Sequence, residues 1–298
     1  MATPIAEFEH EGIRLVGSSL AGEETFVVAP ELNIAFDVGR AQQELLAVDN
    51  VFLSHGHMDH AAGVAYYFSQ RMFIDNQPGV VFAPEPLVDP LQRLMRLWAE
   101  IDGHEPAANI VAAVPDRDIP LRRDLVVRPF AVNHPCRRQG RPTVQALGFV
   151  AIEVRQKLKP EFVGLEGPQL IELKNRGEEI TRTLELPLIA YCGDTAIGPW
   201  LDREDVRKAR VLLLECTFVE PDHIDRARAG YHLHVRDLRE IVPKLANERI
   251  LLTHLSRRTA LRDARAILCE QLGEEMAARL SFFMEFRRRG GRSQPATI

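Results

Sequence analysis

The first part of the chain alternates short apolar segments with turns, a pattern typical of β-strands. Such segments occur at 13–16, 25–29 and 33–36 and are joined by short turns. A further segment, Asn50–Ser54, is apolar along most of its length and predicts a buried strand. The residues from Ala61 through Phe68 then read as a helix. We therefore expect a strand-to-helix turn between 54 and 61.

Several later apolar segments end at, or just before, a histidine or an acidic residue. Segments at 124–133, 186–191, 211–214 and 250–253 read as strands. The polar residues that follow them are His134, Asp194, Glu215 and His254. Side chains at the ends of several strands can form a rigid constellation on one rim of a sheet. The repetition of this pattern favours a shared site over four separate strand ends.

Three segments have helical patterns. Residues 86–101 form an amphipathic helix with one apolar stripe, made of Leu87, Leu91, Leu94, Trp98 and Ile101. We expect this stripe to belong to the core or to an oligomer contact. Residues 235–245 and 259–280 are also expected to be helical, with an interruption of the second at Gly273.

Strands and helices alternate along the chain without an internal linker, which indicates the α/β class. Sheets with helices outside them imply a four-layer α/β/β/α sandwich. We expect a single domain over residues 1–285, with a basic, disordered tail at 286–298. No apolar segment approaches the length that spans a membrane.

The densest chemistry lies in the strand-to-helix turn, where the sequence reads His55-Gly56-His57-Met58-Asp59-His60. His55 and His57 alternate in an extended segment, so their side chains can point to one side. Asp59 and His60 can reach a second point from the turn. Imidazole and carboxylate ligands suit zinc, and the geometry favours two cations side by side. Manganese or iron could occupy the same ligands.

Composition limits the function without deciding it. The 298 residues carry a net charge of −5, which weighs against a general nucleic-acid binder. Local charge matters more than the sum, and Arg137, Arg138 and Arg141 follow His134 closely. We expect these three arginines on the rim of the site, as contacts for substrate phosphates; solvated surface charges are the alternative. The four cysteines have no paired spacing, which favours reduced thiols in a cytoplasmic protein.

Taken together, the motifs resemble the metallo-β-lactamase superfamily, and within it the short form of ribonuclease Z, the tRNA 3′-processing endonuclease. The resemblance runs from about Glu11 to about Arg258. The motifs that carry it are Phe36-Asp37-Val38-Gly39-Arg40, Leu53-Ser54 with the His55–His60 motif, Lys157-Leu158-Lys159 through Gly164-Leu165, Cys192-Gly193-Asp194-Thr195, Glu215-Cys216-Thr217-Phe218, Tyr231-His232-Leu233-His234 and Leu252-Thr253-His254-Leu255-Ser256.

This resemblance implies a fold, a metal site and a reaction. It implies the same four-layer sandwich, with one zinc ion on His55, His57 and His134. It places a second zinc on Asp59, His60 and His254, with Asp194 bridging the two ions. Such a pair can supply hydroxide at neutral pH and clamp both oxygens of a phosphodiester displacement.

The resemblance also implies catalytic side chains: Asp59, together with His232 and Glu215. His232, oriented by Glu215, would protonate the leaving oxygen, since histidine titrates nearest neutral pH. His234 is a second candidate for this role. A purely structural hydrogen bond between Glu215 and His232 is the other possibility.

The expected substrate is a tRNA precursor, and the expected assembly is a homodimer. One feature departs from the family. Its members carry a glycine-rich, basic arm that grips the tRNA elbow, whereas residues 147–187 predict only a small arm of mixed charge. The alternatives are a hydrolase of a small phosphodiester, ester or lactone on the same scaffold, and a binding protein that has kept the fold.

Overall fold

The computed structural model describes residues 3–74, 77–138 and 141–287, without the side chains of 136–144. Within this part, the chain forms two seven-stranded sheets. The first contains β1 (Ala6–His10), β2 (Ile13–Leu20), β3 (Glu24–Ala29), β4 (Ile34–Phe36), β5 (Asn50–Phe52), β6 (Val80–Pro84) and β7 (Asn109–Ala113), in that order. The second contains β8 (Ile119–Arg122), β9 (Leu125–Arg138), β10 (Arg141–Leu158), β11 (Thr181–Tyr191), β12 (Val211–Glu215), β13 (Arg249–Thr253) and β14 (Leu280–Phe282).

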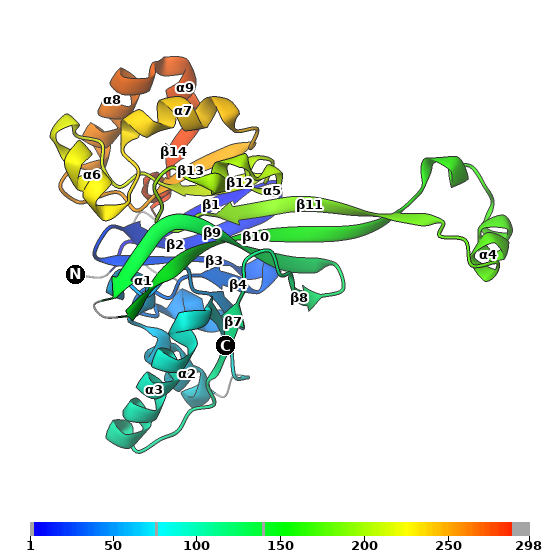
Figure 1. Ribbon diagram of the computed structural model, residues 1–298, viewed down its shortest axis with the longest axis horizontal. Coiled ribbons are helices and arrows are strands. Elements are labelled where there is room, and N and C mark those ends of the chain that lie inside the picture. Colours follow the sequence, from blue (N-terminus) through cyan, green and yellow to red (C-terminus); the bar gives the residue numbers. More distant parts are fainter. Residues whose placement is uncertain (1–2, 75–76, 139–140, 288–298) are drawn as a thin grey trace, which may run out of the picture.

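Helices lie outside both sheets (Figure 1). They are α1 (Met58–Ala61), α2 (Val64–Phe73), α3 (Glu85–Asp102), α4 (Gly167–Asn175), α5 (Glu204–Arg207), α6 (Ile224–Gly230), α7 (Leu238–Ile241), α8 (Leu261–Leu272) and α9 (Glu274–Ala278). The helix expected at 61–68 is α2, which begins at Val64, and the expected turn before it contains the short helix α1. The segment at 235–245 is a series of short helical turns around α7, and Gly273 separates α8 from α9 as expected.

Three apolar clusters bind the four layers together. The central one lies between the sheets, where the rings of Phe36 and Tyr191 stack with centroids 5.0 Å apart. A second packs the first sheet against α2 and α3, and a third packs the second sheet against α7 and α8. The predicted α/β/β/α sandwich is therefore confirmed. The stripe on α3 divides: Leu87 and Leu91 pack against the core, whereas Trp98 and Ile101 are exposed.

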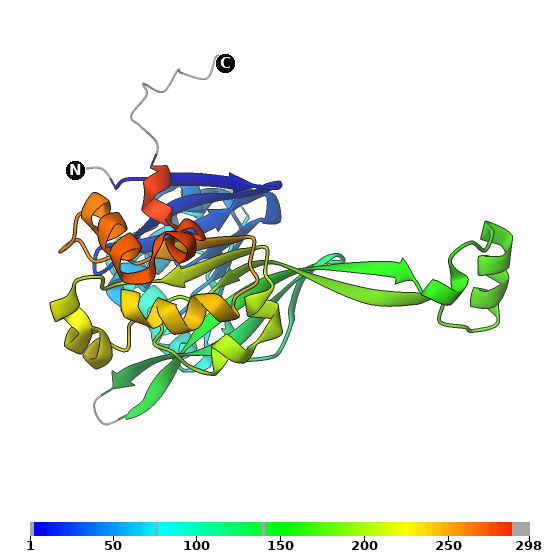
Figure 2. The ribbon, with the colours of Figure 1, turned by 90° about the horizontal axis from the view of Figure 1, so that it is seen from above.

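β10 and β11 continue beyond the sheet as a two-stranded ribbon that ends in α4. We call residues 155–184 the arm. Figures 1 and 2 show it projecting far from the body in two perpendicular views. The expectation of a small arm is therefore wrong. Its strands are polar and exposed, so no apolar run marked them, and a capping box between Glu166 and Gln169 starts the tip helix instead.

Among the described helices, none is long and apolar enough to cross a membrane.

Candidate functional site

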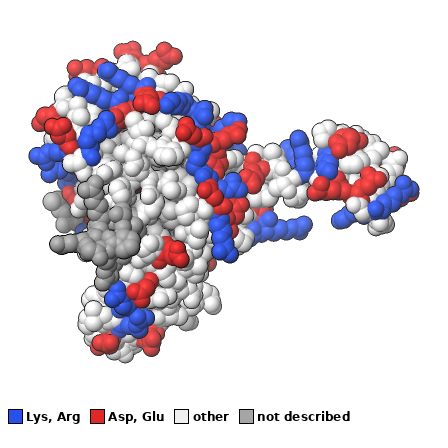
Figure 3. Space-filling model, viewed as in Figure 1, with Lys and Arg blue, Asp and Glu red and all other residues white. Residues whose placement is uncertain are grey.

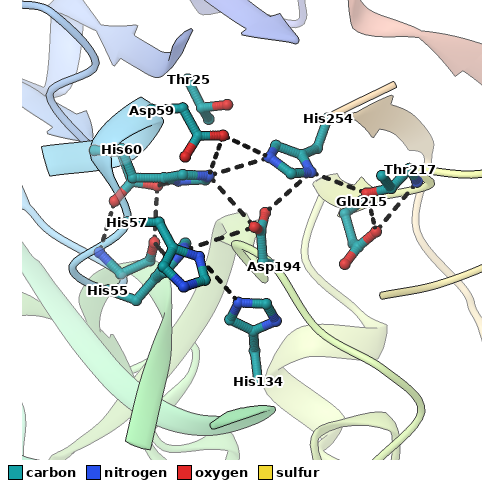
Figure 4. Close-up of polar contacts among 12 residues, drawn as sticks. Thr25, His55, His57, Asp59, His60, His134, Asp194, Glu215, Thr217 and His254 are labelled. Atoms are coloured by element: carbon teal, nitrogen blue, oxygen red, sulfur yellow. Dashed lines mark hydrogen bonds and ion pairs between the residues drawn. The ribbon is translucent and has the colours of Figure 1, made fainter. Parts of the chain in front are cut away.

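The candidate ligands gather where parallel strands end. β4, β5 and β6 are parallel in one sheet, and β11, β12 and β13 are parallel in the other. Their carboxyl ends deliver the His55–His60 turn, Asp194, Glu215 and His254 to one place, and β9 brings His134 (Figure 4). All seven residues expected as metal ligands lie in this cluster.

One group of potential ligand atoms comprises His55, His57, His134 and Asp194, with all atoms within 4.8 Å of one another. Nε2 of His55 lies 3.0 Å from Nδ1 of His57, which lies 3.4 Å from Nε2 of His134. Oδ2 of Asp194 is 3.6 Å from Nε2 of His55. The nitrogens therefore converge on one point beside a carboxylate.

The second group comprises Asp59, His60 and His254. The Nε2 atoms of His60 and His254 are 3.2 Å apart, and Oδ2 of Asp59 lies 3.2 Å from that of His254. Asp194 faces this group too, with Oδ2 at 3.4 Å from Nε2 of His60. Asp194 thus stands between both groups, as a bridging ligand would.

Hydrogen bonds on the far side of four of the five candidate histidine rings decide which nitrogen carries a proton. Nδ1 of His60 donates to Asp37 at 2.7 Å, and Nδ1 of His134 donates to the carbonyl of Tyr231 at 3.1 Å. The hydroxyl of Ser54 donates to Asp37 and so accepts from Nδ1 of His55. Such outer partners fix the tautomer of metal-binding histidines.

His254 follows the same logic. The hydroxyl of Thr217 donates to Glu215, so it accepts from Nδ1 of His254 at 2.9 Å. When these four rings are neutral, their inner nitrogens are left with lone pairs that face one another and have no hydrogen to share. Oδ1 of Asp194 is also buried and accepts no hydrogen bond in the described part of the chain. Cations between these atoms would satisfy them, so the residues present fit a metal pair.

The charges in the site point the same way. Burial and the neighbouring charge of His60 hold the pKa of His55 well below its usual value. At His60 the carboxylates of Asp194 and Asp37 outweigh burial and raise the pKa. His254 and His60 outweigh burial at Asp194, where they keep the pKa well below the ordinary range. The buried carboxylates therefore favour positive charge at the centre of the site.

His232 stands beside the metal-ligand cluster rather than within either main group. Its Nδ1 lies 2.8 Å from Oε1 of Glu215, which is fully buried and also accepts from the Thr195 amide. Burial alone would lower the pKa of His232, but Glu215 raises it to about 9. The ring is thus oriented from one side, which leaves Nε2 available as a proton donor.

His234 does something else. Its Nδ1 accepts from the amide of Arg236 at 3.2 Å, and its Nε2 donates to the carbonyl of Glu220 at 2.9 Å. Both ring nitrogens are therefore used by the backbone. The sequence-based alternative that placed His234 as the proton donor is not supported by this arrangement.

Several residues that orient the site were not identified as such from the sequence. Asp37, Ser54 and Thr217 lie inside the family motifs, but their hydrogen-bonding roles have no spacing that reveals them. The backbone of Arg137 and Arg138 ends β9 and that of Arg141 begins β10, and their side chains fall outside the described part of the structure.

Comparison with known proteins identifies the relatives of this chain. No family model matches the sequence. tRNase Z TRZ1 of Arabidopsis thaliana is 32% identical over 256 residues, which cover 85% of this chain and 89% of that protein. The metallo-β-lactamase fold protein YhfI of Bacillus subtilis superposes with a TM-score of 0.58 at 14% identity, covering 86% of this chain and 91% of that one. Human tRNase Z, short form, gives a TM-score of 0.51 at 16% identity, covering 86% and 87%. The two structural similarities show the shared fold.

Proposed function

Because the chain belongs to the ribonuclease Z family of hydrolytic endonucleases, we propose that it cleaves tRNA precursors on the 3′ side of the discriminator region with a pair of zinc ions. The observation that carries this proposal is the pair of ligand groups with Asp194 between them, placed where the strands of both sheets end. A family relationship over most of the chain supports the RNA substrate.

In this proposal His55, His57 and His134 hold one zinc, Asp59, His60 and His254 hold the other, and Asp194 bridges them. Manganese or iron would fit the same nitrogen and oxygen donors. When bound, the ions supply Lewis acidity and offset the negative charge of the scissile phosphate. The facing lone pairs of the histidines support this assignment, as does Oδ1 of Asp194, which accepts no hydrogen bond in the described part of the chain.

Asp59 has a second role in the proposal. Its Oδ2 accepts a hydrogen bond from the amide of Gly22 at 2.7 Å, which fixes the carboxylate and leaves Oδ1 available to accept another hydrogen bond. We assign Asp59 to orient the attacking water by accepting a hydrogen bond from it. The buried carboxylate of Glu215 orients His232, and Nε2 of His232 then delivers a proton to the departing 3′ oxygen. That oxygen is a poor leaving group until it is protonated.

The arm supports a large RNA substrate over a small diester. It carries basic and acidic residues in near balance (Figure 3), and Val163 and Ile171 at its tip are 70% and 62% exposed. We propose that the arm contacts the tRNA elbow, as in the family it resembles. Arg137, Arg138 and Arg141 remain our candidates for phosphate contacts at the rim.

We further infer a homodimer. Exposed apolar side chains from two neighbouring helices, Tyr66 and Phe73 of α2 with Trp98 of α3, lie together on one face. Large exposed apolar patches of this kind mark interaction surfaces. A single domain over residues 1–285 agrees with the central core, to which both halves contribute. Unpaired thiols at the buried Cys192 and Cys216 favour a reducing compartment such as the cytoplasm.

The test uses purified protein with zinc, a tRNA precursor that has a 3′ trailer, and bis-p-nitrophenyl phosphate. We expect release of the trailer and about two metal ions per chain. His57→Ala should lose at least one ion and most activity, whereas His104→Ala, an exposed histidine away from the site, should lose neither. Full activity of thoroughly demetallated protein would refute the metal site. Hydrolysis of the diester without cleavage of the precursor would refute the RNA substrate.

A further inference from the structure

Arg128 on β9 joins the arm to the body through charged contacts. Its Nε and Nη2 donate to Asp118 at 2.7 and 2.9 Å. Its Nη1 and Nη2 donate to the two oxygens of Glu185 at 3.1 Å each. The guanidinium thus makes paired contacts with two carboxylates, the geometry that gives arginine its directional specificity. Asp118 belongs to the body, and Glu185 lies on β11 at the point where the arm begins.

The body side of this contact is itself held in place. Oδ2 of Asp205, near the start of α5, lies 3.6 Å from Nη1 of Arg128 and accepts from Arg203 at 2.9 Å. Arg203 also pairs with Asp116, and its guanidinium lies 5.3 Å from the centre of the Phe130 ring. The Arg128 side chain is 20% exposed, so the network is partly shielded from water.

The backbone at this point gives the arm little support. Pairing between β9 and β10 ends at Leu125 and Glu153, and the β10–β11 register shifts between Ala151 and Ile152. β11 also contains Pro187, which has no amide hydrogen for the ladder. Beyond the Val154–Glu185 pair, toward the tip of the arm, β10 and β11 pair only with each other among the described strands. An isolated two-stranded ribbon twists strongly and is marginally stable alone.

We propose that Arg128 is a positioning residue that sets the direction of the arm by holding Glu185 against the body. This inference rests on the proposed function, in which the arm contacts the tRNA precursor. The ladder continues for four residue pairs beyond Glu185, roughly 13 Å at the rise of a strand, before the tip begins. A small rotation at Glu185 therefore becomes a larger displacement at the tip, where the RNA would be held.

Two substitutions with opposite charge changes test this role. Arg128→Ala removes a cation, and Glu185→Ala removes an anion. We expect both to raise KM for the tRNA precursor by about tenfold, which corresponds to about 1.4 kcal/mol. The kcat for the precursor and the hydrolysis of bis-p-nitrophenyl phosphate should stay unchanged. If the two residues acted only through their charge, Glu185→Ala would instead improve binding of the RNA.

Matched controls separate the contact from general effects of charge. Arg122→Ala removes an exposed arginine that pairs with Asp124, and Glu240→Ala removes an exposed glutamate of the body that pairs with Lys244. Neither should change KM by more than about twofold, because effects of exposed ion pairs are small. Weakening by Arg128→Ala alone, or equal weakening by Arg122→Ala, would overturn the inference.

A direct measurement keeps the result independent of catalysis. Double electron–electron resonance would measure the distance between a spin label on α4 and one on the body. The distribution of these distances should broaden in Arg128→Ala and in Glu185→Ala. Unchanged distributions in both variants would overturn the inference. If the unaltered protein did not cleave the precursor at all, the proposed function would fail, and these distances would still decide whether Arg128 fixes the arm.

Discussion

At the residue scale, the clustering of the candidate metal ligands was predictable, and the residues that orient them were not. Four ligands within six positions, followed by single residues at strand ends, form a pattern that few other functions require. The roles of Asp37 and Thr217 depend on hydrogen bonds between segments far apart in sequence, such as that from His60 to Asp37 at 2.7 Å. Only the folded chain brings those atoms together, so spacing alone could not assign them.

The role of His232 can be tested through the leaving group. His232→Ala should lower kcat for the tRNA precursor by roughly 10²–10⁴-fold, the usual worth of a positioned acid. The loss should be much smaller for bis-p-nitrophenyl phosphate, because p-nitrophenolate leaves without a proton. Metal content should stay at the level of the unaltered protein. Equal losses on both substrates, or loss of metal, would assign a structural role to the Glu215–His232 hydrogen bond.

The buried carboxylate of Glu24 should make the free energy of unfolding depend on pH. This carboxylate is 1% exposed and accepts from Arg40, Gln42 and Thr3, which outweigh burial and lower its pKa from 4.5. The lowered pKa means that the ionised group stabilises the fold above pH 4.5, and that this contribution is lost as pH falls through the folded value. Glu24→Gln should lower the free energy of unfolding by about 1–2 kcal/mol at neutral pH.

Chemical denaturation at a series of pH values would measure this effect. The difference between the unaltered protein and Glu24→Gln should shrink as the pH falls below 4.5. Glu9→Gln, on the exposed side of β1, is the matched control and should differ little from the unaltered protein at any pH. A difference between Glu24→Gln and the unaltered protein that stayed constant with pH would show that the charge of Glu24 contributes nothing.

At the element scale, many of the buried strands and the long helix were predictable, because apolar periodicity marks what the core requires, although the buried β6 and β14 were not predicted. The strand expected at 25–29 is β3 (Glu24–Ala29), and the helix expected at 86–101 is α3 (Glu85–Asp102). Apolar periodicity did not predict the strands of the arm, because these strands have no buried face. The short helix α7 was merged into a longer one and α1 was taken as part of a turn, since a pattern of spacing does not show where a brief helical turn begins or ends.

Gly230, at the end of α6, leads to a prediction about the position of the His232 ring. A Cβ added at Gly230 would lie 2.7 Å from Cδ2 of His232, closer than two such atoms can approach. Since Glu215 holds the other side of the ring, Gly230→Ala should displace His232. We expect kcat for the tRNA precursor to fall by about tenfold or more with both metals retained. Gly167→Ala, where the added methyl meets no atom within 4 Å, is the control. Unchanged kcat in Gly230→Ala would contradict the placement of His232.

At the scale of the whole molecule, the alternation of strands and helices was enough to predict four layers. The net charge of −5 was a poor guide, because it averages over surfaces with different roles. The arm carries charges of both signs, and the exposed apolar face lies on α2 and α3, which Figure 1 places away from the arm. Neither the direction of the arm nor the exposure of Trp98 and Ile101 in the α3 stripe could be inferred from sequence, because both depend on what the rest of the chain leaves uncovered.

That apolar face leads to a prediction about assembly. The molecular mass of a homodimer in sedimentation equilibrium should be about twice the 33.6 kDa of one chain. Trp98→Glu would place a carboxylate in the interface, and burying an unpaired charge costs several kcal/mol, so the dimer dissociation constant should rise at least roughly tenfold. Val163→Glu, at the exposed arm tip, is the control and should leave the dimer intact. Sedimentation equilibrium at micromolar concentrations would measure the dissociation constant of the dimer. If the unaltered protein were monomeric, or if Trp98→Glu were as dimeric as the unaltered protein, α2 and α3 would not form a dimer interface.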